Sequence, residues 1–124
     1  MIALSILLAA AFTGPDAVPA LEAVKTCDRG AMAEMTKGEP HRRSQFAAAA
    51  YAEQQAIARD RAGLLARPGG DPTPAGQASL MLALSGLDGR QKLLDDARAV
   101  EAGWRTLVDE LRADFLANCA QGKR

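Results

Sequence analysis

Aromatic residues are scarce in this sequence, whereas alanine is abundant. One Trp, one Tyr and three Phe make up 4% of the 124 residues. Aromatic and β-branched residues favour strands, while alanine is the strongest helix former. The composition therefore predicts a fold built from helices alone.

Long blocks of like charge and long apolar runs are also missing. Fifteen basic and fifteen acidic side chains cancel, and no block of like charge is longer than a pair such as Arg42-Arg43. A nucleic-acid partner is therefore not expected. The N-terminal apolar stretch, residues 2–12, is shorter than the roughly 20 residues of a membrane span. We therefore expect no stable membrane span in the processed chain.

Catalytic motifs are absent as well. The only histidine, His41, has neither the second histidine nor the neighbouring cysteines that a metal or haem site needs. No G-x-S-x-G motif and no glycine-rich phosphate loop is present. The paired carboxylates Asp95-Asp96 and Asp109-Glu110 diverge by about 100° on a helix and cannot face one substrate. The sequence predicts a non-enzymatic protein without cofactor or metal.

The N-terminus has the pattern of a secretory leader. The apolar stretch from Ile2 to Phe12 is followed by Val18-Pro19-Ala20, which places small residues at −3 and −1 of a cleavage site. We expect a signal peptide over residues 1–20, a single domain over 21–124, and a periplasmic or secreted location. Ala9-Ala10-Ala11 is an earlier cleavage option. The leader departs from the usual pattern in having no Lys or Arg. The alternative is an N-terminal helix buried in a cytoplasmic core.

Two cysteines, Cys27 and Cys119, stand 92 positions apart. This spacing fits neither a redox pair nor a zinc knuckle, and an even number of cysteines behind a leader favours a structural disulfide. Reduced core cysteines and an intermolecular bridge are the alternatives.

Apolar spacing predicts three helices. The first covers Leu21 to Met35 and is stopped by Gly38-Glu39-Pro40, because proline cannot continue a helix. The second covers His41 to Ala66, and the breakers of residues 67–72 end it. The third covers Pro74 to Cys119 and carries apolar residues at alternating spacings of three and four, as in a coiled coil. It is expected to be continuous, with a break at Gly86–Gly89 as the alternative.

These elements predict an elongated antiparallel helical hairpin. The long C-terminal helix packs against the two shorter helices, and the disulfide holds the end opposite the loop. Counting back from the loop places His41 near Val100 and Ile57 near Leu84. A compact three- or four-helix bundle is the alternative.

Two surfaces are candidate sites. His41, Arg42 and Arg43 stand at the predicted start of the second helix, where backbone N–H groups and positive side chains can hold an anion. The apolar run of residues 80–84 is broader than one neighbouring helix can cover, and its large members form a candidate interaction surface: Leu80, Met81, Leu82 and Leu84.

The expected function is an exported interaction or scaffold module whose protein partner is unknown. Self-association into a homo-oligomer through residues 80–84 is also expected. The alternative function is a periplasmic holdase that binds unfolded clients on the apolar face. A leader followed by long charged helices is similar, in architecture alone, to periplasmic helical chaperones of the Skp and Spy kinds.

Overall fold

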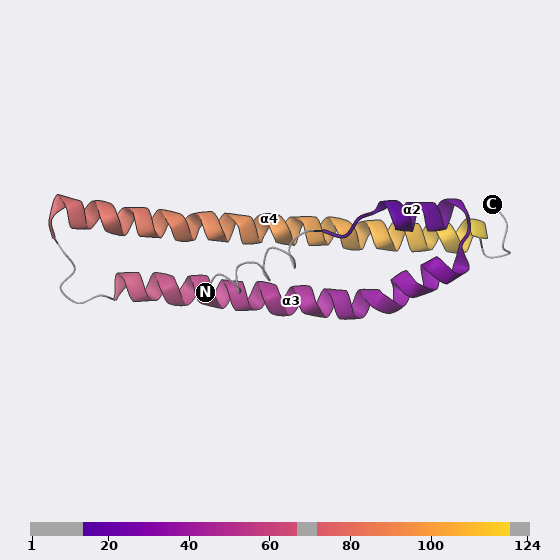
Figure 1. The fold of residues 1–124 in the computed structure, drawn as a ribbon, viewed down its shortest axis with the longest axis horizontal. Helices are drawn as coiled ribbons and strands as arrows, with labels where there is room; N and C mark the ends of the chain where they lie inside the picture. Colours follow the sequence, from indigo (N-terminus) through magenta and orange to yellow (C-terminus); the bar gives the residue numbers. More distant parts are fainter. Residues whose placement is uncertain (1–13, 67–71, 120–124) are drawn as a thin grey trace.

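A computed structural model describes residues 14–66 and 72–119. Within these ranges the chain forms three helices and no strand: α2 (Val18–Lys25), α3 (Arg29–Leu65) and α4 (Pro74–Cys119). Figure 1 shows α3 and α4 side by side and antiparallel, with the short α2 packed at the end opposite the loop. The predicted all-α antiparallel hairpin is confirmed. The apolar stretch of residues 2–12, which the sequence predicts to belong to a signal peptide, and the loop residues 67–71 lie outside the described residues.

Helix α4 is continuous through Gly86 and Gly89. The residues on its inner face recur at spacings of three, four and seven, and among them Leu87, Leu94 and Leu111 are buried. This apolar face packs along α3 and stabilises the helix through the two glycines, which cost about 1 kcal/mol each relative to alanine. The expectation of one unbroken C-terminal helix is confirmed.

The predicted helix stop at Gly38-Glu39-Pro40 is wrong, because α3 runs through all three residues. Pro40 has no N–H to donate to the carbonyl of residue 36, which bends a helix without necessarily ending it. Figure 1 shows such a bend in the N-terminal third of α3. The Glu39 side chain binds Arg42 and Arg43 at helical spacing, and these contacts favour helical geometry across the proline.

The predicted first helix, Leu21 to Met35, is instead two helices. α2 ends at Lys25, Cys27 has a left-handed φ of 52°, and α3 begins at Arg29. The carboxylate of Asp28 accepts a hydrogen bond of 3.0 Å from the Ala31 N–H, so Asp28 is the N-cap of α3. The turn reverses the chain and packs α2 against both α3 and α4.

The core consists of two apolar clusters along the hairpin. The cluster at the disulfide end joins all three helices through Ala20, Ala23, Val24, Met32, Trp104, Val108 and Leu111. The central cluster joins α3 and α4 through Phe46, Ala50, Ile57, Leu94 and Ala97. The expected cleavage point after Ala20 therefore lies within α2, next to a buried residue.

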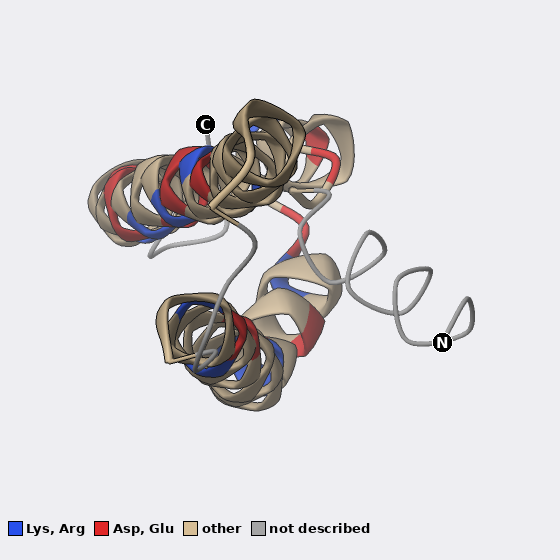
Figure 2. Cartoon of the chain, turned by 90° about the vertical axis from the view of Figure 1, so that its left-hand side faces the viewer, with Lys and Arg blue, Asp and Glu red and all other residues tan. Residues whose placement is uncertain are grey.

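Positions occupied by basic and acidic residues are interspersed along α3 and α4, as the ribbon colours in the end-on view of Figure 2 show. Salt bridges cross between the two helices near the loop, where Arg61 pairs with Asp88 and Arg90 pairs with Asp60. Exposed pairs of this kind contribute little, about 0–1 kcal/mol each. No helix in the described ranges is long and apolar enough to cross a membrane.

Candidate functional site

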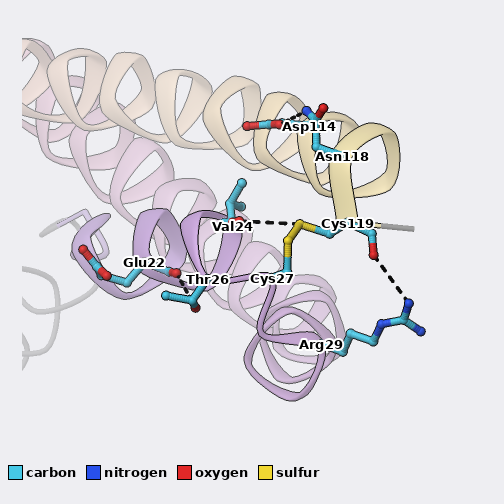
Figure 3. The surroundings of a disulfide bond; sticks show 8 residues. All are labelled: Glu22, Val24, Thr26, Cys27, Arg29, Asp114, Asn118 and Cys119. Carbon is cyan, nitrogen blue, oxygen red and sulfur yellow. Dashed lines mark hydrogen bonds between the residues drawn. A yellow bond between two sulfur atoms is a disulfide. The ribbon is translucent and has the colours of Figure 1, made fainter. Parts of the chain in front are cut away.

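The disulfide joins the turn before α3 to the last residue of α4. The Cα atoms of Cys27 and Cys119 are 5.4 Å apart, and their sulfur atoms are bonded to each other. Cys119 is fully buried, and its Sγ lies 3.6 Å from the Val24 carbonyl oxygen of α2 (Figure 3). Arg29 donates a hydrogen bond of 3.4 Å to the Cys119 carbonyl oxygen. This bond stabilises the C-terminal end of α4, because the last carbonyl groups of a helix have no partner within the helix. The predicted intramolecular disulfide is confirmed.

A buried ion-pair network separates the two apolar clusters. Arg42 bridges two buried carboxylates: its Nε lies 2.7 Å from Glu39 Oε1, and its Nη1 lies 2.7 Å from Glu101 Oε2. Trp104 donates its Nε1–H to Glu39 over 2.8 Å, and Arg105 donates to Glu101 over 2.9 Å. The contacts of Arg42 with Glu101 and of Trp104 with Glu39 join α3 to α4 and fix the position of one helix along the other.

The hydrogen bonds to Glu39 decide its ionisation. Burial raises the pKa of this carboxyl, but the hydrogen bonds from Arg42, Trp104 and Arg43 outweigh it and hold the pKa at about 2, against an ordinary 4.5. Burial also raises the pKa of Glu101, and its bonds to Arg42 and Arg105 lower it further than burial raises it. Both side chains are therefore ionised at neutral pH, and their role here is to pair the helices.

The anion contact predicted for His41, Arg42 and Arg43 was based on a helix N-terminus at these residues, and the structure has no helix N-terminus there. These residues lie inside α3, which begins at Arg29, so no free backbone N–H groups of a helix start surround them. Carboxylates of the chain itself occupy the guanidinium groups of Arg42 and Arg43. The predicted helix start at His41 is wrong for the same reason as the predicted break before it.

The apolar residues 80–84 lie on α4 close to the loop. Met81 is 65% exposed and Leu82 is 76% exposed, whereas Leu80 and Leu84 are half-buried toward α3. We call Leu80, Met81, Leu82 and Leu84 the loop-end surface. Neighbouring residues on a helix point about 100° apart, so α3 covers one side of this run and leaves the adjacent side in solvent.

A groove lies between α3 and α4 at the other end of the hairpin, beside the disulfide. Its volume is about 640 Å³. We call it the disulfide-end groove, and it is lined by Arg29, Met32, Ala33, Thr36 and Lys37 of α3 and by Arg112, Phe115, Leu116 and Cys119 of α4. Sequence reasoning missed it, because it needs two segments about 80 positions apart. The sequence does contain one signal for it. On each helix the lining residues recur at spacings of three and four positions, so they share one helix face.

No protein-family model matches the chain, and comparisons with curated proteins and with solved structures find no significant match. No group of three or more metal-ligating side chains occurs in the described part of the chain.

Proposed function

We propose that this chain is a non-enzymatic interaction module of an oxidising, exported compartment, and that it binds a protein partner through the loop-end surface. The observation that carries the proposal is the exposure of two adjacent large apolar side chains, Met81 and Leu82. Exposed apolar residues that gather on one surface are typical of interaction sites. This surface lies on the continuous helix α4, which packs against α3.

The disulfide supports an exported location, because structural disulfides persist in oxidising compartments. Intact mass of the protein recovered from cells tests the export. Cleavage after Ala20 gives a chain that begins at Leu21, whereas cleavage after Ala11 leaves α2 whole. A full-length, reduced chain in the cytosol would contradict the proposed location.

A holdase is the second candidate function, and the same surface favours it. Methionine is flexible and polarisable and therefore adapts to partners of varied shape. A holdase exposes such a surface to many unfolded clients, whereas an interaction module binds one folded partner. Suppression of the aggregation of an unrelated protein at low molar ratio supports the holdase.

Two leucine variants of α4 test the surface. Leu82→Glu places a charge on the loop-end surface, and Leu116→Glu makes the same change at the opposite end, where Leu116 is 66% exposed. Both sites are exposed and glutamate is a good helix former, so both variants should keep their helical content. Affinity purification from the native envelope should recover a stoichiometric partner with wild type and Leu116→Glu, and lose it with Leu82→Glu.

Sedimentation of the purified protein determines whether that partner is a second copy. A homo-oligomer that Leu82→Glu converts to a monomer identifies self-association through this surface. If Leu82→Glu and wild type recover the same proteins and sediment alike, the loop-end surface is not the binding site and the proposal fails.

A further inference from the structure

The disulfide-end groove combines an apolar floor with basic ends. Met32 and Ala33 of α3 face Phe115 and Leu116 of α4 across it, and none of its described lining residues is acidic. Among the described residues that line it, the charged ones are three cations: Arg29, Lys37 and Arg112. Such a groove is complementary to a ligand that has an apolar body and a negative charge.

The antiparallel packing places the cations at defined ends. Lys37 is the last lining residue along α3 and Arg112 is the first along α4, so both stand at the end that faces the hairpin centre. Neither takes part in a salt bridge in the described ranges. Arg29 stands at the other end, where it donates to the Cys119 carbonyl oxygen.

The length of the groove selects the kind of ligand. Its lining covers about eight residues on each helix, which corresponds to about 12 Å at 1.5 Å per residue. An extended chain of single bonds advances about 1.2 Å per bond, a third of the span of an extended residue, so roughly ten methylene carbons fit. The volume of about 640 Å³ lies within the ~300–1,000 Å³ of small-molecule sites.

Three other occupants fit less well. A peptide helix is about 10 Å wide with its side chains, and two turns of groove leave it few anchor positions. The chain's own C-terminal residues carry Lys123 and Arg124, which have the same sign as the cations of the groove. The apolar, uncharged stretch of residues 2–12 offers no anion to Lys37 and Arg112.

We propose that the disulfide-end groove binds a medium-chain fatty acid. Its carboxylate accepts hydrogen bonds from Lys37 and Arg112, which are charge-assisted and therefore strong. Its alkyl chain lies along Met32, Phe115 and Leu116 toward the disulfide. The Cys27–Cys119 bond holds the start of α3 to the end of α4, so it fixes the width of the groove.

Calorimetric titration of the oxidised protein with decanoate, below its micelle concentration, tests the proposal. One molecule should bind per chain. Decyltrimethylammonium, with the same tail and the opposite charge, should neither bind nor displace decanoate. Lys37→Gln and Arg112→Gln should each weaken binding about tenfold, equivalent to about 1.4 kcal/mol, whereas Arg59→Gln, an exposed cation elsewhere on α3, should leave it unchanged.

The two leucine variants keep this proposal separate from the proposed function. Leu116→Glu should abolish decanoate binding and preserve the protein partner, and Leu82→Glu should do the reverse. Equal binding of the cationic and anionic amphiphiles, or unchanged affinity in the Lys37 and Arg112 variants, would overturn the proposal. Binding only to vesicles that contain an anionic lipid, or only to an acidic amphipathic peptide, would overturn it too.

Discussion

Replacing both Cys27 and Cys119 with alanine is expected to lower the free energy of unfolding by several kcal/mol. The disulfide spans a sequence separation of 92 residues, and in the chain-entropy model a loop of that length is worth about 4.6 kcal/mol at 25 °C. Single domains have about 5–15 kcal/mol in total. The double variant should therefore melt on the order of 20 °C lower than the wild type.

The loss should begin at the disulfide end. α2 has few buried side chains, which are Ala20, Ala23 and Val24, and the turn at Cys27 connects it to the end of α4. Without the disulfide, α2 and the first turn of α3 should open locally before the hairpin unfolds. The central cluster around Ile57 and Leu94 contains no α2 residue, so it should stay folded.

Hydrogen exchange followed by mass spectrometry measures both effects. In the double variant, amides of residues 18–28 should lose most of their protection, while those of residues 46–57 should fall only to the level set by the lowered free energy of unfolding and stay the better protected. Reduction of the wild type should reproduce this pattern. Denaturant titration gives the change in the free energy of unfolding. A double variant within about 1 kcal/mol of wild type, with unchanged protection of residues 18–28, would refute the structural role of the disulfide.

Four further substitutions test the helices and their pairing. Because the pKa of Glu39 is about 2 when folded and 4.5 ordinarily, its pairing stabilises the fold above pH 4.5, and this stability is lost as the pH falls toward 2. Glu39→Gln should lower the melting temperature at pH 7 and flatten its decline between pH 5 and 3; an equally steep decline would contradict this assignment. Gly86→Ala and Gly89→Ala should each raise the free energy of unfolding by about 1 kcal/mol in denaturant titrations, because an added Cβ meets no atom within 4 Å at either position. A lower free energy of unfolding in either variant would contradict the continuous α4 helix at these residues. Pro40→Ala should stabilise α3 by up to about 3 kcal/mol by the same assay, and destabilisation would show that the bend is required.

Local patterns were sufficient to predict much of the fold. The alternating spacing through Leu87, Ala97 and Leu111 predicts one seam along α4, and these residues are buried. The same spacing placed Leu93 and Val100 on the seam, but both are exposed, and Leu94 is buried instead. The disulfide was predictable because the chain has two cysteines whose spacing fits neither a redox pair nor a zinc site. Counting back from the loop placed His41 near Val100, and Arg42 indeed bonds to Glu101. Near the loop the count is less accurate. It places Ile57 near Leu84, so Arg61 would lie near Leu80, but Arg61 donates a hydrogen bond to Asp88 instead.

The missed features depend on residues distant in sequence. Glu39 and Pro40 have the composition of a turn, but Trp104, 65 positions away, binds the Glu39 carboxylate and helps to hold the helix across them. The break after Lys25 had a local signal in Asp28, a good N-cap, but the left-handed turn at Cys27 accompanies the disulfide to Cys119. The groove requires the first turns of α3 and the last turns of α4, which only the hairpin brings together.

Photocrosslinking in cells that produce the protein naturally tests the central claim, that the loop-end surface is where this chain contacts other proteins. A photoreactive amino acid is placed at position 82, on the loop-end surface, or at position 110, an exposed site on α4 near the disulfide end. We expect protein adducts from position 82 and none from position 110, with a single discrete adduct for one partner and many adducts for a holdase. No adduct from position 82, or the same adducts from both positions, would contradict the claim.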